Sequence, residues 1–402
     1  AVRDLGSGDS GTFEALGALA DAAAATERRV VAQGHDVGFV VSVLRAWRSG
    51  GVLCPLESGQ RLPEEPPPPE GTALLKRTSG TTGAPRSIRF TASQMTSDGD
   101  AIVTSMGLHP GQPNLGVISL AHSYGFANLI LPLLLHGVPL YLVPSPLPEV
   151  LARCVRGCPE PALTLPAVPA LWTTWLQADV IPAAVRLAIS AGAPLPLALE
   201  EAVFQRHGLK LHNFLGASEC GGIAYDPSSV PRTDGTLAGW PLHGVGVDSD
   251  AEGCLTVRGP AVGAGYWPEP DAPLLGGVYR ARDRVELTPG GGVRLLGRAG
   301  DLINVAGRKL HPETVEAELL RHAGVRAALV LGVPEDSIRG DAVAAVVQAD
   351  ASVSDASLRE FLAARLPAWQ LPRIWHRVGR LEANTRGKIS RAEWRARLSP
   401  PG

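Results

Sequence analysis

Short apolar runs typical of buried strands alternate with longer segments of helical periodicity between residues 115 and 330. Clear examples are LGVISLA followed by YGFANLILPLLLHG, and VRLAISAG followed by PLALEEAVFQRHG. Strand–helix alternation of this kind is typical of helices layered on a largely parallel sheet. The pattern therefore predicts an α/β fold.

The pattern changes after about Gly235, where short strands such as GCLTVRGPAV and GVYRARDRVEL are separated by glycines. Such strands predict an antiparallel, β-barrel-like subdomain. Beyond Asp301, helix and strand patterns follow one another in a compact α+β unit, and about a hundred residues are enough for a separate domain. We therefore predict a large N-terminal domain over residues 1–300 and a small C-terminal domain over residues 301–402.

Composition and charge exclude several classes of protein. Of 402 residues, 45% are hydrophobic and 19% are charged, and the formal net charge is −2, so nothing indicates nucleic acid or an anionic membrane as partner. No apolar run approaches the about 20 residues that a membrane span needs, and the Ala-rich N-terminal region is typical of an amphipathic helix. An odd number of cysteines without a CxxC pair predicts free thiols and a cytoplasmic location. These cysteines are Cys54, Cys154, Cys158, Cys220 and Cys254.

The segment LLKRTSGTTGAPR, residues 74–86, places glycines and hydroxyl side chains between an apolar run and an arginine. Glycines let the backbone approach an anion, and successive N–H groups in such a turn form an anion-binding nest. The Walker pattern GxxxxGK[ST] is absent, and for the loop alone a plain turn remains the alternative. The predicted phosphate-binding residues are Thr78, Ser79, Gly80, Thr81, Thr82, Gly83 and Arg86.

Further motifs follow the loop in a fixed order along the chain. They are NFLGASECGG at 213–222, GPAVGAGYW at 259–267, YRARDRVEL at 279–287, GRAGDLINVAGRKLHPETVEAEL at 297–319 and NTRGKISR at 384–391. Together with the loop, this series resembles the AMP-forming adenylating superfamily of acyl- and aryl-CoA ligases, peptide-synthetase adenylation domains and firefly luciferase. The chain looks most like an acid–CoA ligase.

The resemblance implies that a carboxylic acid attacks the α-phosphate of ATP, releasing pyrophosphate, and that the acyl-adenylate then passes to the thiol of CoA. Both reactants are anionic, so the site has to position them and spread their charge. The resemblance implies Mg²⁺ on Glu219 after Ser218, and a catalytic Lys388 on a mobile C-terminal domain that turns about the hinge Asp301. Its further nucleotide-binding residues are Ala191, Gly192, Ala193, Asn213, Phe214, Leu215, Asp283 and Arg298, with Asp283 and Arg298 at the ribose.

The segment LAHSYGFANLILPLLLHG, residues 120–137, resembles the motif that borders the acyl pocket. His122 stands where aryl- and acyl-CoA ligases often carry a pocket gate with a role in catalysis, and a histidine satisfied at a helix start is the alternative. Ala127 stands where amino-acid-activating relatives carry an aspartate, and an ammonium without a counter-charge is costly in an apolar pocket. An α-amino acid is therefore disfavoured.

The segment SAGAPLP, residues 190–196, and residues 216–222 of the second motif are expected to line the rest of the pocket. Gly221 and Gly222 are expected to leave room for a flat or long acyl group, and the bulky Trp172 and Trp175 are expected in the core. The predicted pocket residues are His122, Ala127, Gly216, Ala217, Gly221 and Gly222.

Several positions depart from the resembled family. Arg86 replaces the usual lysine, Leu215 replaces a ring that stacks on adenine, and Ala281 and Arg282 replace the small neighbours that usually precede Asp283. The acceptor also stays open: CoA, the phosphopantetheine thiol of an acyl carrier protein, or an amine. A non-catalytic nucleotide-binding homologue is the alternative of another class. A small carboxylic acid is the expected substrate.

Overall fold

The computed structural model describes residues 1–22, 28–78, 86–156, 158, 160–334, 340–381 and 391–398. The chain forms two compact units, which are described separately below. The first comprises residues 1–248, 256–281 and 287–293, and the second comprises residues 249–255, 282–286 and 294–402. The second unit thus includes residues 249–255, 282–286 and 294–300, which lie before the boundary predicted at residue 300.

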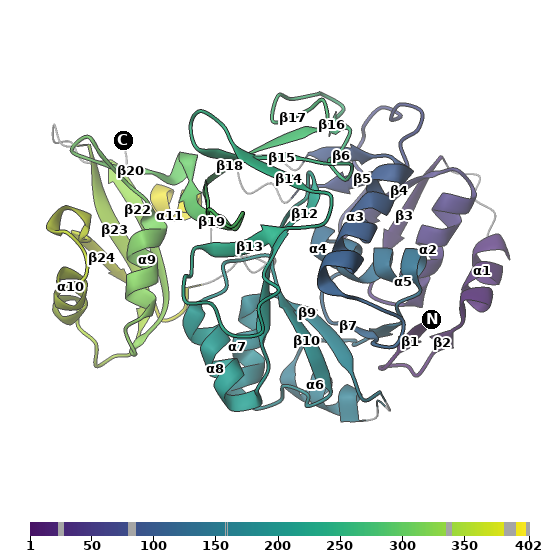
Figure 1. The fold of residues 1–402 in the computed structure, drawn as a ribbon, viewed down its shortest axis with the longest axis horizontal. Helices are drawn as coiled ribbons and strands as arrows, with labels where there is room; N and C mark the ends of the chain where they lie inside the picture. Colours follow the sequence, from purple (N-terminus) through teal and green to yellow (C-terminus); the bar gives the residue numbers. More distant parts are fainter. Residues whose placement is uncertain are drawn as a thin grey trace. The chain divides into compact units, whose positions relative to one another are not determined.

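A large sheet forms the centre of the first unit (Figure 1), and six neighbouring strands of this sheet run parallel to one another. Its parallel strands lie in the order β1, β8, β7, β9, β10, β11, while β2 is antiparallel to β1, and β12 and β13 continue the sheet in antiparallel pairs. The strands are β1 (Val2–Asp4), β2 (Ser10–Gly11), β7 (Asn114–Gly116), β8 (Leu140–Leu142), β9 (Leu163–Ala167), β10 (Val185–Ser190), β11 (Leu211–Ala217), β12 (Gly221–Tyr225) and β13 (Leu237–Pro241).

Helices connect these strands as the sequence pattern predicted. They are α6 (Pro148–Arg156), α7 (Pro169–Gln177) and α8 (Leu197–His207). Every residue of β9 is buried, as expected for a parallel strand covered on both faces. Trp172 and Trp175 of α7 are fully buried, pack edge to face with ring centroids 5.3 Å apart, and donate to the carbonyls of Ile189 and Pro146. The prediction that both tryptophans belong to the core is confirmed.

A second sheet of the first unit holds the two ends of the predicted phosphate loop. Strands β3, β4 and β5 are parallel, and β6 and β16 continue the sheet in antiparallel pairs. The elements of this part are α1 (Phe13–Ala22), β3 (Arg29–Gln33), α2 (Val37–Arg48), β4 (Val52–Leu56), β5 (Leu74–Arg77), β6 (Ser87–Phe90), α3 (Ala92–Met106) and β16 (Gly265–Trp267). The loop therefore lies between two paired strands, β5 and β6.

The segment predicted to border the acyl pocket is helical with a change of winding. It consists of α4 (Ser123–Gly125), the π-helix η1 (Phe126–Ile130) and α5 (Leu131–His136). Gly125 is required here, because a Cβ at this position would overlap the carbonyl oxygen of Ser119. Wide π turns inside helices often occur at functional sites.

The Gly-rich segment after residue 235 contains short strands, as predicted. They are β14 (Gly246–Ser249), β15 (Cys254–Arg258), β17 (Leu274–Leu275), β18 (Val278–Leu287) and β19 (Val293–Arg298). Strands β17 and β18 pair antiparallel, and the boundary between the two units runs through β14, β15, β18 and β19.

The second unit has the predicted α+β character. A hairpin of β20 and β21 precedes a sheet in which β22 and β23 are antiparallel and β24 is parallel to β23. Leu319 of α9 and Leu358 of α10 are fully buried in the core that this sheet shares with them. The elements are η2 (Ala299–Asp301), β20 (Ile303–Val305), β21 (Arg308–Leu310), α9 (Pro312–Leu320), β22 (Val325–Pro334), β23 (Asp341–Ala349), α10 (Asp355–Ala363), η3 (Ala368–Gln370), β24 (Ile374–Arg377) and α11 (Arg391–Leu398).

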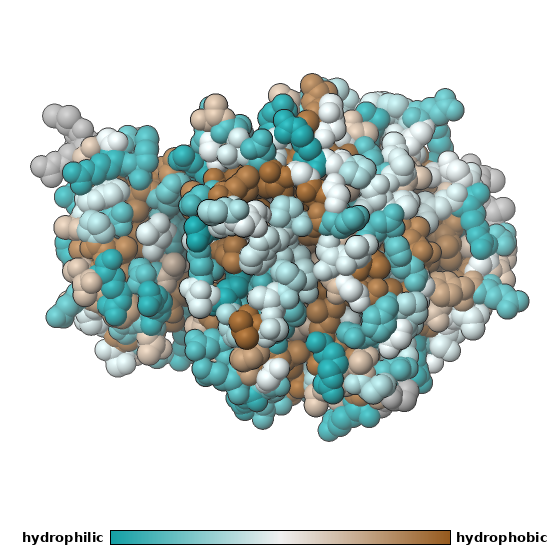
Figure 2. Space-filling view, viewed as in Figure 1, coloured by the Kyte–Doolittle hydropathy of each residue, from teal (hydrophilic) through white to brown (hydrophobic). Residues whose placement is uncertain are grey.

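The surface carries hydrophilic side chains over much of the face in Figure 2, with hydrophobic ones among them. Within the described parts of the chain, no helix is both long and apolar enough to cross a membrane. All five cysteines are free thiols, as predicted.

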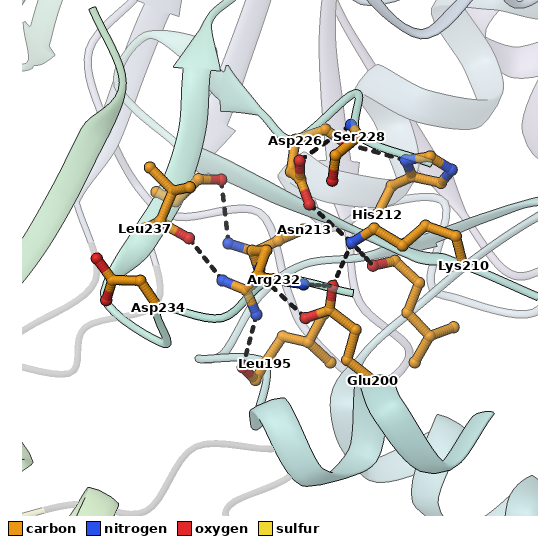
Figure 3. A network of polar contacts seen from close by, with 12 residues as sticks. Leu195, Glu200, Lys210, His212, Asn213, Asp226, Ser228, Arg232, Asp234 and Leu237 are labelled. Carbon is orange, nitrogen blue, oxygen red and sulfur yellow. Dashed lines mark hydrogen bonds and ion pairs between the residues drawn. The ribbon is translucent and has the colours of Figure 1, made fainter. Parts of the chain in front are cut away.

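Four buried charged side chains tie α8 to β11 and to the segment between β12 and β13 (Figure 3). Glu200 lies between Lys210 and Arg232, with Arg232 Nε 2.9 Å from Glu200 Oε2, and Lys210 Nζ is also 2.7 Å from Asp226 Oδ2. All four side chains are at most 5% exposed. Two cations thus balance two carboxylates inside the first unit.

Replacing Lys210 by Met is expected to destabilise the first unit strongly, because the buried Asp226 carboxylate would lose its cation and Glu200 would keep only Arg232. Breaking a buried pair in this way costs about 3–5 kcal/mol of the free energy of unfolding. Urea unfolding followed by tryptophan fluorescence measures it. The matched control is Arg206→Met on α8, whose partner Asp179 is 3.0 Å away and exposed, and for which a loss below about 1 kcal/mol is expected. Equal losses in the two variants would contradict the prediction.

Candidate active site

The base of the predicted phosphate loop is closed by backbone and side-chain hydrogen bonds. The Thr78 N–H donates to the Arg86 carbonyl at 2.8 Å, and the Arg86 N–H donates to Thr78 Oγ1 at 2.9 Å. These bonds continue the pairing of β5 with β6 up to the point where the loop begins. The other predicted loop residues lie outside the described residues, and so does Lys388. These are Ser79, Gly80, Thr81, Thr82 and Gly83.

The guanidinium of Arg86 is held from two sides. Its Nη1 lies 2.7 Å from Asp271 Oδ2, and its central carbon lies 3.7 Å from the centroid of the Tyr266 ring. A guanidinium stacks on an aromatic face while keeping its donors in the plane. The charge that replaces the usual lysine is therefore fixed at the base of the loop.

Tyr266 also contacts Glu219, the predicted magnesium ligand. Its O–H donates to Glu219 Oε1 at 3.1 Å, and the Gly263 N–H donates to the Glu219 carbonyl at 2.8 Å. Burial, followed by the charge of Glu219, raises the pKa of Tyr266 well above its ordinary value, so the phenol keeps its proton. The structure thus brings together the loop base, the motif at 213–222 and the motif at 259–267.

Sequence reasoning quoted the motif GPAVGAGYW but assigned no role to Tyr266. The available signal was an aromatic residue directly before the last position of a Gly-rich motif of the resembled family. Its partners were not predictable, because β16 pairs with β6 from far away in the sequence, with Tyr266 opposite Ile88.

Ser218 and His122 both lie at the start of the short helix α4. Ser123 Oγ donates to Ser218 Oγ at 2.9 Å, so the pocket segment meets the second motif. His122 is the N-cap of α4 and its Nδ1 accepts from the Tyr124 N–H at 3.3 Å. This geometry matches the alternative of a histidine at a helix start, while its role as a catalytic pocket gate stays a prediction.

One segment predicted to bind the nucleotide follows the carboxyl end of β10, and the other begins where β11 stops pairing with β10. Ser190 of β10 pairs with Asn213 of β11, and Ala191 and Ala193 follow β10, with Gly192 between them at φ +86°. Ligands bind open α/β sheets outside the carboxyl ends of strands, so this placement fits a nucleotide.

Side chains of β11 have defined partners in the fold. Asn213 Nδ2 donates to the Ala238 carbonyl at 3.1 Å, and Phe214 is buried with its ring 6.0 Å from that of Tyr124. Leu215 is partly exposed. Among the pocket residues, Ala127 is buried in the π-helix, whereas Gly216 is exposed.

The structure gives a different reason for glycine at positions 221 and 222 from the one predicted. A Cβ on Gly221, which has φ +71°, would overlap the Asp98 carboxylate, and a Cβ on Gly222 would lie 2.5 Å from Leu242 Cδ2. The Gly222 N–H donates to Asp98 Oδ1 at 2.9 Å. Protein atoms thus fill the space beside both glycines, and the expectation that they leave room for an acyl group is wrong.

Two buried ionisable groups that interact with each other, one of them also with Glu219, were also missed from the sequence. Lys76 of β5 lies over the Phe90 ring, with Nζ 4.6 Å from the centroid, and burial lowers its pKa. Burial raises the pKa of Asp98 on α3, and the charge of Lys76 opposes part of this rise. The available signal was a lysine directly after the apolar residues that precede the predicted phosphate loop.

The predicted ribose residues meet within the second unit. Arg298 Nε lies 3.1 Å from Asp283 Oδ1, and both side chains are partly exposed. A carboxylate beside a guanidinium presents both acceptors and donors, which suits the two hydroxyls of a ribose.

The predicted hinge Asp301 is paired with the segment that follows Lys388. Arg391 Nη1 lies 3.0 Å from Asp301 Oδ2, and its Nη2 lies 2.8 Å from Glu316 Oε1 and 3.0 Å from Glu313 Oε1. Three carboxylates thus hold one arginine, which begins α11. Sequence reasoning placed Arg391 in the last motif but did not predict this pairing.

The chemistry of Glu219 fits a magnesium ion bound mainly through a substrate. Mg²⁺ is usually held by one or two carboxylates together with substrate phosphates and water. The described residues contain no group of three or more His, Cys, Asp or Glu side chains that could form a complete metal cage. Glu219, with one oxygen already hydrogen-bonded, is suited to a shared metal–phosphate site.

Known proteins resemble this chain in sequence. The model of AMP-binding enzymes matches residues 14–267, and the model of the AMP-binding enzyme C-terminal domain matches residues 314–388. The anthranilate–CoA ligase of Pseudomonas aeruginosa is 31% identical over 353 residues, which are 81% of this chain and 67% of that enzyme. The sulfoacetate–CoA ligase of Cupriavidus necator is 29% identical over 393 residues, 92% of this chain and 75% of that enzyme.

Solved structures share the fold. ATP-bound MatB from Rhodopseudomonas palustris has a TM-score of 0.87 at 22% identity, covering 99% of this chain and 95% of its own. The o-succinylbenzoate CoA synthetase MenE from Bacillus subtilis, in complex with its acyl-adenylate, has a TM-score of 0.83 at 20% identity, covering 98% and 94%. The α/β fold with a smaller C-terminal part is thereby confirmed. Because the first family model alone matches more than half of its residues, the chain belongs to the family of AMP-binding enzymes.

Proposed function

We propose that this protein is an AMP-forming acid–CoA ligase. It activates an aryl or fatty carboxylic acid with ATP to an acyl-adenylate, releases pyrophosphate, and transfers the acyl group to the thiol of CoA. The observation that carries the proposal is the contact of Arg86 with Tyr266 and of Tyr266 with Glu219, since it gathers a cation and a carboxylate beside the loop. The sequence relatives named above are CoA ligases, which supports the choice of acceptor.

Each group then has a task in the first half-reaction. The acid's carboxylate attacks the α-phosphorus of ATP, the new P–O bond forms as the bond to the leaving pyrophosphate breaks, and positioning with charge neutralisation does most of the work. We assign the β- and γ-phosphates to the loop and Arg86, and the ribose hydroxyls to Asp283 and Arg298. We assign Lys388 to the developing charge, since a lysine is a compact point charge on a long arm.

Magnesium is proposed as the metal, and Glu219 as the residue that would hold it. A bound Mg²⁺ would neutralise phosphate oxygens and orient the leaving group. The protein's own contribution is the orientation of the Glu219 carboxylate by the Tyr266 hydroxyl and the retention of Arg86 by Asp271.

The acid is proposed to lack a charged α-amine. Ala127 is buried and apolar at the position where amino-acid-activating relatives carry an aspartate, and an unpaired ammonium there would be costly. An acyl carrier protein or an amine remains the alternative acceptor. The free thiols support a cytoplasmic location, since reducing compartments keep cysteines unpaired.

Acid-dependent pyrophosphate release tests the proposed function. With MgATP and a panel of benzoic, cinnamic, short-chain and long-chain acids and α-amino acids, we expect release with an aryl or fatty acid and none with amino acids. Addition of CoA is expected to raise the rate and to yield a thioester. Release without any CoA effect would favour a carrier protein or an amine, and ATP binding without release on any acid would favour a non-catalytic homologue.

Glu219→Gln is expected to lower the rate of acyl-adenylate formation about 10²-fold to 10³-fold. Losses of this size are typical when an enzyme loses one preorganised group that stabilises charge in the transition state. The physical reason is the loss of the carboxylate charge that would hold the metal. Single-turnover release of pyrophosphate measures it. Glu201→Gln, an exposed glutamate on α8, is the control and should leave the rate unchanged.

Lys388→Ala is expected to slow acyl-adenylate formation by a similar factor, about 10²-fold or more. Transfer of the acyl group from an added acyl-adenylate to CoA should be much less affected, because the lysine is assigned only to the first half-reaction. Arg359→Ala removes an exposed cation from α10 and serves as the control. Unchanged pyrophosphate release in Lys388→Ala would refute the lysine assignment.

A further inference from the structure

We propose that Tyr266 is a positioning residue for the metal–phosphate part of the site. Its hydroxyl orients the Glu219 carboxylate, and its ring holds the Arg86 guanidinium. One side chain thereby sets the geometry of two groups of opposite charge. This inference rests on the proposed function, because it assigns Glu219 to the metal and Arg86 to the phosphates.

The hydroxyl of Tyr266 is suited to orienting a carboxylate. It donates to Glu219 Oε1, so we assign Oε2 as the oxygen for the metal. A rotating carboxylate would lose entropy on binding a metal, whereas one that is already hydrogen-bonded loses less. The residue is buried, where a hydrogen bond is electrostatically stronger than in water.

The ring of Tyr266 is suited to holding Arg86. The guanidinium carbon lies 3.7 Å from the ring centroid, and Asp271 binds Nη1 at 2.7 Å. The backbone of Tyr266 is fixed, since β16 pairs with β6 and places Tyr266 opposite Ile88, two residues after Arg86. The stacking therefore depends on strand pairing rather than on the conformation of the loop.

A purely structural role would have a different signature. A tyrosine that only fills space at the edge of a core would lower stability when truncated, without changing how the metal affects nucleotide binding. A positioning residue would change the dependence on metal while the fold stays intact. The two roles are therefore separated by a measurement of Mg²⁺ dependence at equilibrium.

The test is Tyr266→Phe, which removes the hydroxyl and keeps the ring under Arg86. ATP affinity is measured by calorimetry at a series of free Mg²⁺ concentrations, which requires no turnover. The Mg²⁺ concentration that half-maximally strengthens ATP binding is expected to rise about tenfold, in line with loss of a hydrogen bond to a charged group. ATP binding without metal is expected to stay unchanged.

Two further variants sharpen the assignment. Tyr266→Leu also removes the ring, and it is expected to weaken metal-free ATP binding about threefold or more, because Arg86 loses its stacking partner. In Glu219→Gln, the additional change Tyr266→Phe is expected to have no further effect on the Mg²⁺ dependence, because the hydroxyl acts through that carboxylate.

Tyr141→Phe is the matched control. Tyr141 on β8 also donates its hydroxyl to a glutamate, Glu160 Oε1 at 2.7 Å, at a site without a predicted role. Its removal should leave the Mg²⁺ dependence as in the wild type. Thermal unfolding of all variants reports any loss of stability separately.

An unchanged Mg²⁺ midpoint in folded Tyr266→Phe would overturn the inference, and so would an equal shift in Tyr141→Phe. A wild-type protein that binds MgATP but releases no pyrophosphate with any acid would overturn the proposed activity alone, since the binding titration still decides the role of Tyr266. A wild-type protein that binds no ATP with Mg²⁺ would overturn both.

Discussion

The antiparallel pairing of β6 with β16 is the constraint on which the candidate site depends. It places Tyr266 beside the strand that follows the predicted phosphate loop, and from there the ring contacts Arg86 and the hydroxyl contacts Glu219. A triphosphate with a metal needs groups of both signs at fixed positions. Two hydrogen-bonded strands fix these positions more firmly than a loop can.

Buried charge recurs around this arrangement. Lys76 is buried and interacts with both Asp98 and Glu219. The Asp98 carboxylate fills the space beside Gly221 and accepts a hydrogen bond from the Gly222 N–H. Buried charges are costly unless they are paired, so their presence requires neighbours that fit closely. The turn that carries Glu219 is therefore held by packing against α3 as well as by Tyr266.

Much of the fold was predictable because strands and helices are specified by local periodicity. The alternation from β9 to β11 and the core position of Trp172 follow from residues close in sequence. The reason for glycine at position 221 could not be predicted from the sequence, because the carboxylate that occupies the space of a side chain there belongs to Asp98, over a hundred positions earlier. The partners of Tyr266 and Arg391 could not be predicted either, because they too are distant in the sequence.

The arginine at position 86 fits its surroundings better than the usual lysine would. Its planar group stacks on Tyr266 and bonds Asp271 at the same time. An ammonium has no flat face to stack and attracts more water. A lysine here would keep the charge but lose the contact that links the loop to Tyr266 and, through it, to Glu219. The departure from the family pattern at Arg86 and the presence of Tyr266 and Asp271 are therefore parts of one arrangement, in which the loop cation is anchored before any nucleotide binds.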